Sequence, residues 1–449
     1  MKFQKIENKE TFLQNVINHA PRYLGGSLIG SGVGLLMTKY YTSVFTPTEF
    51  GILSLYAVMF QYIMLIVSLN MTSGATRLYF DYRENKRDEY LSTIFWFTIA
   101  TSIITFAIGL ILMPFIVSLI SAHSEFLYIV TIILGITAVF VSFFTSILYN
   151  EKLSKSVFKN NIIQTVSNHL ISIVFIAIFP FGILGRQIGQ CSGYLANLLA
   201  LIRELGKKKL FQLKCAFNLL MLKETFSLSL PSFITSLLGI VFIYLDRIFL
   251  KYFYGNKEVG IYSLGFILGQ GLSMIYEAIS LSLFPKTMED LKEDYKNNIV
   301  KLEKFAYQYY FGLIFITLIL VLSSKWLVML FSTKEYFEAS RVLPFVMVGF
   351  MMGGFYKIPS LVLGYHKIVW FYPFLAFFSF GANGFLNYLL IPKYEMIGAA
   401  FATFAGLFIY SSVVQGMTMK FNTKRYNIIT ASIYILIFAA ISVSFYKII

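Results

Sequence analysis

Long blocks of apolar residues recur along almost the whole chain, and they constrain the fold more than any other feature. Each block is long enough for a helix to cross a hydrocarbon core of ~30 Å. Because 57% of the residues are hydrophobic and only 13% are charged, we expect an all-α polytopic membrane protein. Thirteen spans are predicted, at residues 21–44, 50–71, 90–118, 124–149, 158–179, 182–203, 223–252, 259–284, 303–331, 340–364, 368–391, 395–418 and 427–446. The ninth has an alternative end near Leu322, which would leave Trp326 to Phe331 in the membrane interface.

The basic residues gather in alternate loops between these spans. With a cytosolic N-terminus, the inside segments hold most of the 37 Lys and Arg residues. This positive-inside pattern explains the net charge of +15 better than nucleic-acid binding does, so no nucleic-acid partner is expected. An added role of these charge runs in attracting anionic lipid head groups stays open.

The two cysteines, Cys191 and Cys215, are too few for a disulfide scaffold. Cys215 lies in the basic loop, so we expect a reduced cytosolic thiol there. No cleavable signal is evident before the first span.

A seven-residue phrase occurs twice, first as Glu49 to Leu55 and again as Glu258 to Leu264. The two copies open spans two and eight, so the repeating unit contains six spans and keeps its orientation. We therefore predict two six-helix lobes related by a pseudo-twofold axis along the membrane normal. The predicted organisation is an N-terminal lobe (1–203), a basic cytosolic linker (204–222), a C-terminal lobe (223–418) and an extra C-terminal span (419–449).

Ionisable residues inside spans are costly, and they are the first candidates for function. Lys39 lies in the outer part of span one, and Asp246, Arg247 and Lys251 lie in the outer part of span seven, its repeat partner. Cations on matched helices suit an anionic head group, since Arg offers a planar fork for phosphate and Lys a point charge. The alternatives are that Lys39 and Lys251 reach the outer interface, that Arg247 pairs with a nearby acid, and that Asp246 pairs or caps near that site.

Arg77 and Lys286 are equivalent in the repeat, at the inner ends of spans two and eight. They are candidates for meeting a diphosphate that enters from the cytosolic leaflet, or they only anchor the topology. Glu277 and Lys357 have matching depths, which favours a salt bridge inside the C-terminal lobe over a gate or a coupling-ion site. His169, beside Asn168 in span five, fits a buried structural histidine better than a proton carrier.

No enzyme signature is present in the sequence. There is no Gly-Lys-Ser/Thr phosphate loop, so the chain cannot power transport with its own ATPase, and there is no metal-spaced His/Cys cluster. We expect neither a catalytic residue nor a metal nor a cofactor.

Four stretches carry a resemblance to a known family: TEFGILSL, YLDRIFL followed by VGIYSL, FSTKEYFEASRVLPF, and IPKYEMIGAA. In their order and spacing the chain resembles the polysaccharide flippase branch of the multidrug/oligosaccharidyl-lipid/polysaccharide superfamily, to which multidrug MATE transporters also belong. The resemblance covers nearly the whole chain. Two departures are Ser332-Thr333, where a Gly is common, and Glu395, which replaces a common turn Gly.

The resemblance implies alternating access between two six-helix lobes. Its substrate would be undecaprenyl-diphosphate-linked oligosaccharide, moved from the inner to the outer leaflet of a bacterial or archaeal cytoplasmic (inner) membrane. A basic cavity residue late in helix one of the family is matched by Lys39 rather than Arg, and the family's Asp-Arg of helix seven is matched by Asp246-Arg247. Implied partners are the lipid bilayer, a polysaccharide polymerase and a chain-length regulator. Two alternatives within the superfamily stay open: a cation-coupled drug exporter and a peptidoglycan-precursor flippase.

Overall fold

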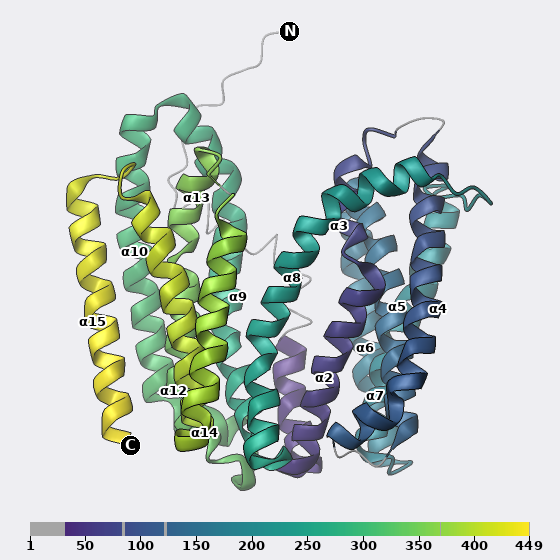
Figure 1. The fold of residues 1–449 in the computed structure, drawn as a ribbon, viewed down its shortest axis with the longest axis horizontal. Coiled ribbons are helices and arrows are strands. Elements are labelled where there is room, and N and C mark those ends of the chain that lie inside the picture. The colour runs from purple at the N-terminus through teal and green to yellow at the C-terminus, as the bar shows by residue number, and fades with distance from the viewer. Residues whose placement is uncertain (1–31, 83–85, 121–123, 369, 449) are drawn as a thin grey trace. The chain divides into compact units, whose positions relative to one another are not determined.

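The computed structural model describes residues 32–82, 86–120, 124–368 and 370–448, and the secondary structure of this part is helical throughout (Figure 1). The part of the first predicted span before residue 32 lies outside the described residues, as do Arg83 and Gly30. The chain separates into two compact units. One comprises Ile29–Ser263 and Leu330–Phe337, and the described part of the other lies in Leu264–Met329 and Glu338–Ile449.

The first unit holds the helical residues 32–44 and seven further helices, together with the first turns of α9. These helices are α2 (Pro47–Ser68), α3 (Met71–Leu78), α4 (Arg87–Ile120), α5 (Glu125–Asn150), α6 (Ser154–Ala177), α7 (Gly182–Lys207) and α8 (Leu219–Tyr254). Leu69 and Asn70 both have positive φ, and they separate α2 from α3. The predicted second span is therefore broken at its inner end, so that Arg77 lies on a separate short helix.

The second unit begins within α9 (Asn256–Glu293). It continues through α10 (Tyr295–Leu322), α11 (Ser324–Phe331), the 3₁₀ turn η2 (Lys334–Tyr336), α12 (Ala339–Phe355), α13 (Lys357–Tyr365), α14 (Tyr372–Thr418) and α15 (Lys424–Ile448). The alternative end of span nine is confirmed, because α10 stops at Leu322 and a separate helix follows. The unit boundary falls between Ser263 and Leu264, whereas the predicted lobes divide at the linker 204–222; the assignment of the two lobes stays a prediction.

Nine helices within the described ranges are long and apolar enough to cross a membrane, which confirms a polytopic all-α membrane protein. The helices α6 and α7 cover the predicted spans 158–179 and 182–203, but they are not among the nine. Polar side chains lower their hydropathy, and these are the side chains that form the candidate site described below. The total of thirteen spans stays a prediction.

Helix α14 contains two predicted spans. A straight helix of its 47 residues would be roughly 70 Å long, more than twice the hydrocarbon thickness. The helix is interrupted at Glu395, which has φ 52° and ψ −132°, and the backbone of Gly398 lies against the carbonyl of Leu390. The chain therefore reverses at the position where the sequence departs from the expected turn glycine.

Helix α2, which contains the first copy of the repeated phrase, begins with a capping box. The Thr46 hydroxyl accepts a hydrogen bond from the Glu49 amide, and the Glu49 carboxylate accepts one from the Thr46 amide at 2.9 Å. A similar cap begins α10, where the side-chain and backbone amides of Asn297 donate to Asp294 and lower the pKa of its carboxyl group.

The two copies of the phrase touch each other through their glycines, and the contact is reciprocal. A Cβ atom on Gly51 would lie 1.8 Å from the carbonyl oxygen of Asn256, and one on Gly260 would lie 1.8 Å from that of Pro47. Pro47 and Asn256 are themselves equivalent in the repeat. Such exchange of equivalent contacts is the signature of local two-fold packing, and it requires a residue without a side chain in both copies.

Candidate functional site

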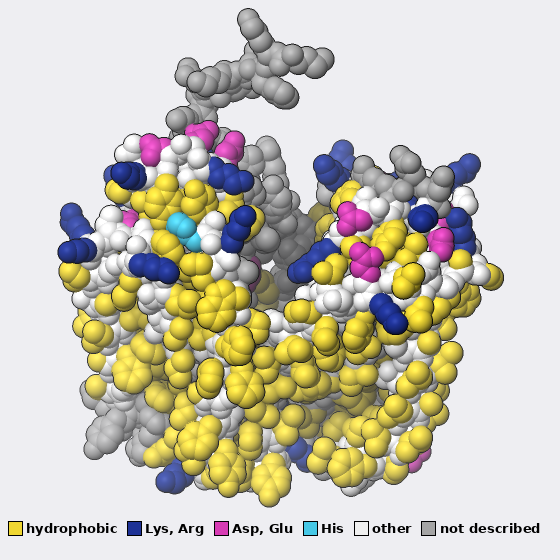
Figure 2. Space-filling view, turned by 45° about the horizontal axis from the view of Figure 1, so that its top comes forward, with side chains coloured by type: hydrophobic (Ala, Val, Ile, Leu, Met, Phe, Trp, Pro, Cys, Tyr) yellow, Lys and Arg dark blue, Asp and Glu magenta, His cyan; other side chains and the backbone are white. Residues whose placement is uncertain are grey.

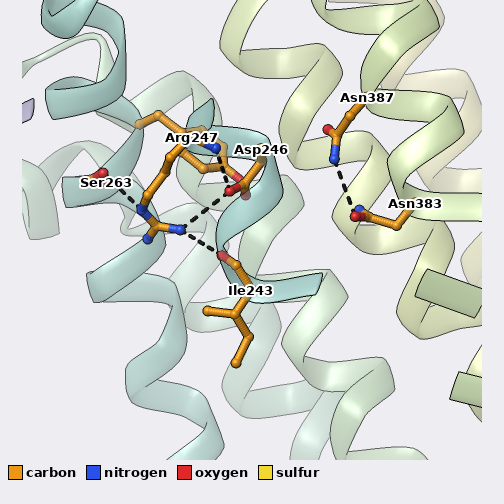
Figure 3. A network of polar contacts seen from close by, with 7 residues as sticks. Ile243, Asp246, Arg247, Ser263, Asn383 and Asn387 are labelled. Atoms are coloured by element: carbon orange, nitrogen blue, oxygen red, sulfur yellow. Dashed lines mark hydrogen bonds and ion pairs between the residues drawn. The ribbon is translucent and has the colours of Figure 1, made fainter. Parts of the chain in front are cut away.

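Asp246 and Arg247 form a buried polar network near the end of α8 (Figure 3). Their relative exposures are 0% and 4%. The Arg247 guanidinium donates to the Ile243 carbonyl at 2.7 Å and to Ser263 Oγ at 3.2 Å, and it pairs with Asp246 Oδ1 at 3.3 Å. The Asp246 carboxylate also accepts from the Arg247 amide at 2.7 Å and from the Tyr262 hydroxyl. The pairing expected of Asp246 is therefore present.

Residues of the second repeated phrase complete this network. The Ser263 hydroxyl accepts a hydrogen bond from the Arg247 guanidinium, and the centre of the Tyr262 ring lies 5.8 Å from the guanidinium carbon. The ring of Tyr244, in α8 itself, lies 5.1 Å from the same carbon. Since Gly260 allows the phrase to pack closely, it also positions Ser263 and Tyr262. The charge of Arg247 is thus compensated within the protein.

Lys39 differs from Arg247 in that its side chain is exposed. Its ammonium group donates to the carbonyl of Ser332, in the segment 330–337 of the same unit. Lys251 is half-buried in the last turn of α8. The binding role predicted for Lys39 stays a prediction, but its exposure leaves the side chain accessible.

A second cationic cluster was missed from the sequence, and Arg186 is its centre. Arg186 lies in the first turns of α7, where its Nη1 donates to Asn168 Oδ1 at 2.7 Å and to Ser172 Oγ at 3.4 Å. Its guanidinium carbon lies 4.7 Å from the centre of the Tyr41 ring. The Tyr41 hydroxyl in turn bonds His169 Nδ1 at 3.0 Å.

A glycine stripe on α7 places Arg186 beside α6. Gly185, Gly189 and Gly193 recur every four residues and pack against Phe175, Ser172 and Asn168 of α6. A Cβ atom at Gly189 would lie 2.1 Å from Ser172 Oγ. This small-residue spacing lets two helices approach closely, which puts the amide of Asn168 within reach of the guanidinium.

Arg186 is half-buried, and no carboxylate of the described residues lies within ion-pair distance of it. Both of its hydrogen bonds use Nη1, so Nε and Nη2 have no acceptor among the described side chains and carbonyls. An amide and an aromatic face stabilise a cation but do not neutralise it. The cluster therefore retains a positive charge that can attract an anion.

The signal for Arg186 was present in the sequence. An arginine four residues inside a predicted span, with Gln187, Gln190 and Asn197 further along, meets the rule that makes intramembrane charges functional candidates. Its partners could not be found, because Tyr41 and Asn168 are far from it in the chain.

The two cations predicted at the inner ends of spans two and eight, Arg77 and Lys286, have different surroundings in the structure. Arg77 is exposed in the last turn of α3, whereas Lys286 is half-buried and pairs with Asp290 at 3.5 Å, one helical turn away. Contact of either residue with a diphosphate stays a prediction.

Glu277 and Lys357 form the salt bridge that their matching depths favoured. Lys357 Nζ lies 2.6 Å from Glu277 Oε1, and the rings of Tyr356 and Tyr276 lie 5.0 and 5.5 Å from the ammonium group. The Lys357 side chain is 14% exposed and that of Glu277 50%. A gating role for this pair stays a prediction.

Helix α14 carries a buried polar stripe of Ser379, Asn383 and Asn387, all fully buried. The Asn387 amide donates to Asn383 Oδ1 at 3.2 Å, while Asn383 Nδ2 and Asn387 Oδ1 have no partner among the described residues (Figure 3). Both cysteines are free, with Cys191 buried and Cys215 exposed. No group of three metal-ligating side chains occurs in the described part of the chain.

The fold defines a class of protein, the multi-pass all-helical membrane proteins, and it is similar to the fold of transporters of the MOP superfamily. An inward-facing multidrug resistance MATE family transporter of that superfamily matches with a TM-score of 0.74 at 14% identity, over 92% of this chain and 98% of that one. The lipid II flippase MurJ, in an inward closed conformation, matches with a TM-score of 0.71 at 17% identity, over 96% and 99%. At such identities the likeness concerns the fold alone.

The family follows from the sequence. The family described as "Polysaccharide biosynthesis protein" matches residues 20–289, more than half of the chain, and the chain belongs to it. The solved structures that share this fold are a transporter and a flippase, the kind of protein that the sequence led us to expect.

Two curated relatives add detail. An uncharacterised membrane protein of Methanocaldococcus jannaschii is 23% identical over 430 residues, 89% of this chain and 82% of its own length. The capsular polysaccharide biosynthesis protein CapF of Staphylococcus aureus is 28% identical over 189 residues, 41% of this chain and 46% of its own.

Proposed function

We propose that the protein is a flippase that moves undecaprenyl-diphosphate-linked oligosaccharide from the inner to the outer leaflet of the cytoplasmic membrane by alternating access. The observation that carries this proposal is the uncompensated positive charge of Arg186 inside a transporter fold. A carrier for an anionic lipid needs cations that its own carboxylates do not neutralise. Membership of a polysaccharide biosynthesis family supports the oligosaccharide part.

In the proposed mechanism, Arg186 and the exposed Lys39 attract the diphosphate, and Arg247 lies in the same unit. The fork of Arg186 leaves Nε and Nη2 for phosphate oxygens, while Tyr41 and Asn168 hold its plane. Arg77 and Lys286 would meet the head group at the inner face, with the N-terminus on that side. A polymerase and a chain-length regulator would act on the delivered product.

The membrane potential would favour this direction of transport. Outward movement of a negative charge from a negative-inside cell gains ~2.3 kcal/mol per 100 mV. We further propose that the empty cationic site returns inward with the potential, so that flipping in proteoliposomes slows on depolarisation. An unchanged rate would contradict this second step.

Of the two alternatives, only the cation-coupled exporter requires different charges. A cation-coupled exporter needs a buried acid in the N-terminal helices, but the carboxylates of the described residues 32–207 lie near helix ends or in loops, as Glu49, Glu125 and Glu151 do. The substrate of a peptidoglycan-precursor flippase has a similar anionic diphosphate. That alternative therefore differs from the proposal in the group that is attached to the diphosphate.

The test is a flipping assay with a fluorescent undecaprenyl-diphosphate oligosaccharide in proteoliposomes. We expect transport by the wild type and its loss in Arg186→Gln and Lys39→Gln, while Lys257→Gln, an exposed control, stays active. A cationic dye and lipid II are the parallel substrates. Transport of the dye with no movement of either lipid would overturn the proposal, and transport of lipid II alone would assign the peptidoglycan substrate.

A further inference from the structure

An apolar cavity lies at the end of the first unit that carries the basic linker. Its volume is about 490 Å³, within the range of ~300–1,000 Å³ that is usual for small-molecule sites. Residues of α4, α5, α7 and the linker line it, among them Phe95, Phe140, Phe144, Leu205 and Phe211. Every lining residue is apolar or glycine, so the cavity suits a hydrocarbon chain.

The linker wall of this cavity is fixed to α4 by hydrogen bonds. The Lys214 amide donates to Ser92 Oγ at 2.9 Å, and the Trp96 indole donates to the Lys214 carbonyl at 2.9 Å. Phe211 packs between the rings of Phe95 and Phe144, with centroids 6.3 and 6.1 Å away. The cavity is therefore built into the unit and does not depend on a loosely placed loop.

Four cations, called the rim cations, each lie within two residues of a cavity-lining residue in the chain: Arg203, Lys207, Lys209 and Lys214. All four are exposed, and none has a carboxylate partner among the described residues. Lys208 differs, since it pairs with Glu204 at 2.9 Å. The nearby Asp88 accepts from the Gln212 amide, and Glu89 accepts from Asn218. The rim is thus net positive, because its four cations outnumber Asp88 and Glu89.

The same linker exposes apolar side chains. Leu213 is 50% exposed, Phe217 55% and Leu220, in the first turn of α8, 77%. Basic residues mixed with exposed large apolar ones are the composition of a segment that lies in the membrane interface. In Figure 2, the Lys and Arg side chains likewise gather at one end of each unit, above a belt of hydrophobic side chains.

We propose that this cavity binds one acyl chain of an anionic phospholipid, whose head group lies on the four rim cations. Apolar walls take the chain and the uncompensated lysines take the phosphate, a pairing typical of cytoplasmic-leaflet lipid sites. The site contains none of the residues proposed to contact the transported substrate, so it stands independently of the proposed function.

Gly206 offers a direct test, because it lines the cavity and a Cβ atom there would meet nothing within 4 Å. Gly206→Phe should fill the cavity without a clash in the backbone. Gly416→Phe, at an equally open and exposed glycine near the end of α14, is the matched control. Native mass spectrometry of the full-length protein in detergent would count bound lipid after incubation with phosphatidylglycerol or phosphatidylcholine of the same acyl chains.

We expect the wild type and Gly416→Phe to retain phosphatidylglycerol over phosphatidylcholine, and Gly206→Phe to lose that preference. Neutralising Arg203, Lys207 and Lys214 to Gln should weaken phosphatidylglycerol retention by about fivefold for each charge removed. The same change at Lys292, Lys296 and Lys304, also exposed, should leave it unaltered.

Equal retention of both lipids by the wild type, or unchanged retention in Gly206→Phe, would overturn the proposal. A photoreactive phosphatidylglycerol should label peptides that contain Phe95, Phe140 or Phe211. Displacement of that label by undecaprenyl monophosphate but not by unlabelled phosphatidylglycerol would assign the cavity to the isoprenoid tail of a substrate instead.

Discussion

Arg247 and Arg186 are both arginines inside helices of the same unit, but their surroundings differ. Arg247 is 4% exposed and bonds a carboxylate, a carbonyl and a hydroxyl. Arg186 has an amide, a distant hydroxyl and an aromatic face, with no carboxylate within ion-pair distance among the described residues. The first arginine is neutralised by its own fold and the second is not.

The difference separates a structural role from a binding role. Removing one partner of a buried ion pair leaves a charge that is expensive to bury. Removing a charge that has no opposite charge beside it leaves no buried counter-charge behind and mainly harms what the charge binds. Stability and transport should therefore respond in opposite ways to substitution at the two positions.

The largest effect is expected at Arg247. Arg247→Ala leaves the fully buried Asp246 carboxylate without its cation, which should cost about 3–5 kcal/mol of stability. A fall in the melting temperature of the purified protein, followed by tryptophan fluorescence in detergent, would measure it.

The double variant Asp246→Asn with Arg247→Met sharpens this result, because it removes both charges and keeps the volume. We expect it to recover most of the lost stability. If it also restores polysaccharide export, Arg247 is structural. If it folds but does not export, the contact with an anionic head group that the sequence predicts for Arg247 is supported.

Arg186→Gln should give the reverse pattern. Loss of charged hydrogen bonds worth about 1.5–3 kcal/mol would lower the flipping rate roughly 10- to 100-fold, while the melting temperature stays the same or rises. Arg186→Lys keeps the charge and should retain an intermediate rate. If Arg186→Gln lowers the melting temperature instead, Arg186 has a structural role like that of Arg247, and the difference between the two arginines does not hold.

Gly260→Ala tests whether the packing of the repeated phrase supports the Arg247 network. The added methyl group would lie 1.8 Å from the Pro47 carbonyl, and such overpacking costs about 1–3 kcal/mol. Gly312→Ala, where a methyl group meets nothing within 4 Å, is the control and should not lower the melting temperature. The Arg186 cluster should keep its substrate affinity wherever the Gly260 variant still folds.

The smallest effect is expected at Tyr41. Tyr41→Leu removes the aromatic face beside Arg186, a contact worth about 0.5–2 kcal/mol, and should weaken substrate binding several-fold. Tyr41→Phe keeps the ring, loses only the bond to His169 and should bind nearly as the wild type does. A titration of flipping rate against lipid concentration separates the two, and equal losses in both variants would assign the effect to the hydroxyl.

The fold was predictable to the extent that apolar length determines it. The spans, the end of α10 at Leu322 and the Glu277–Lys357 pair follow from composition and depth, which are local properties. The cluster of Arg186 was not predictable in the same way. It depends on a glycine stripe in α7, which brings Asn168 close to Arg186. It also depends on Tyr41, which lies 145 positions before Arg186 in the chain. Contacts of this kind cannot be predicted from local composition.

Arg247 is the converse case, and its binding role stays a prediction. A charge deep in a span is a functional candidate by default, but its neighbour Asp246 turns back toward it through the amide at 2.7 Å. Adjacent residues on a helix point in different directions, so the sequence favoured separate roles for the two. In the structure, Asp246 Oδ1 accepts hydrogen bonds from both the backbone amide and the guanidinium of Arg247.

The reciprocal contact of Gly51 and Gly260 explains why the repeated phrase can still be recognised in both of its copies. At neighbouring positions of the phrase the copies have drifted apart, with Phe50 opposite Val259 and Leu53 opposite Tyr262. At the glycines they cannot drift, because a side chain in either copy would strike the backbone of the other. The steric contact between the two copies therefore restricts both positions to glycine.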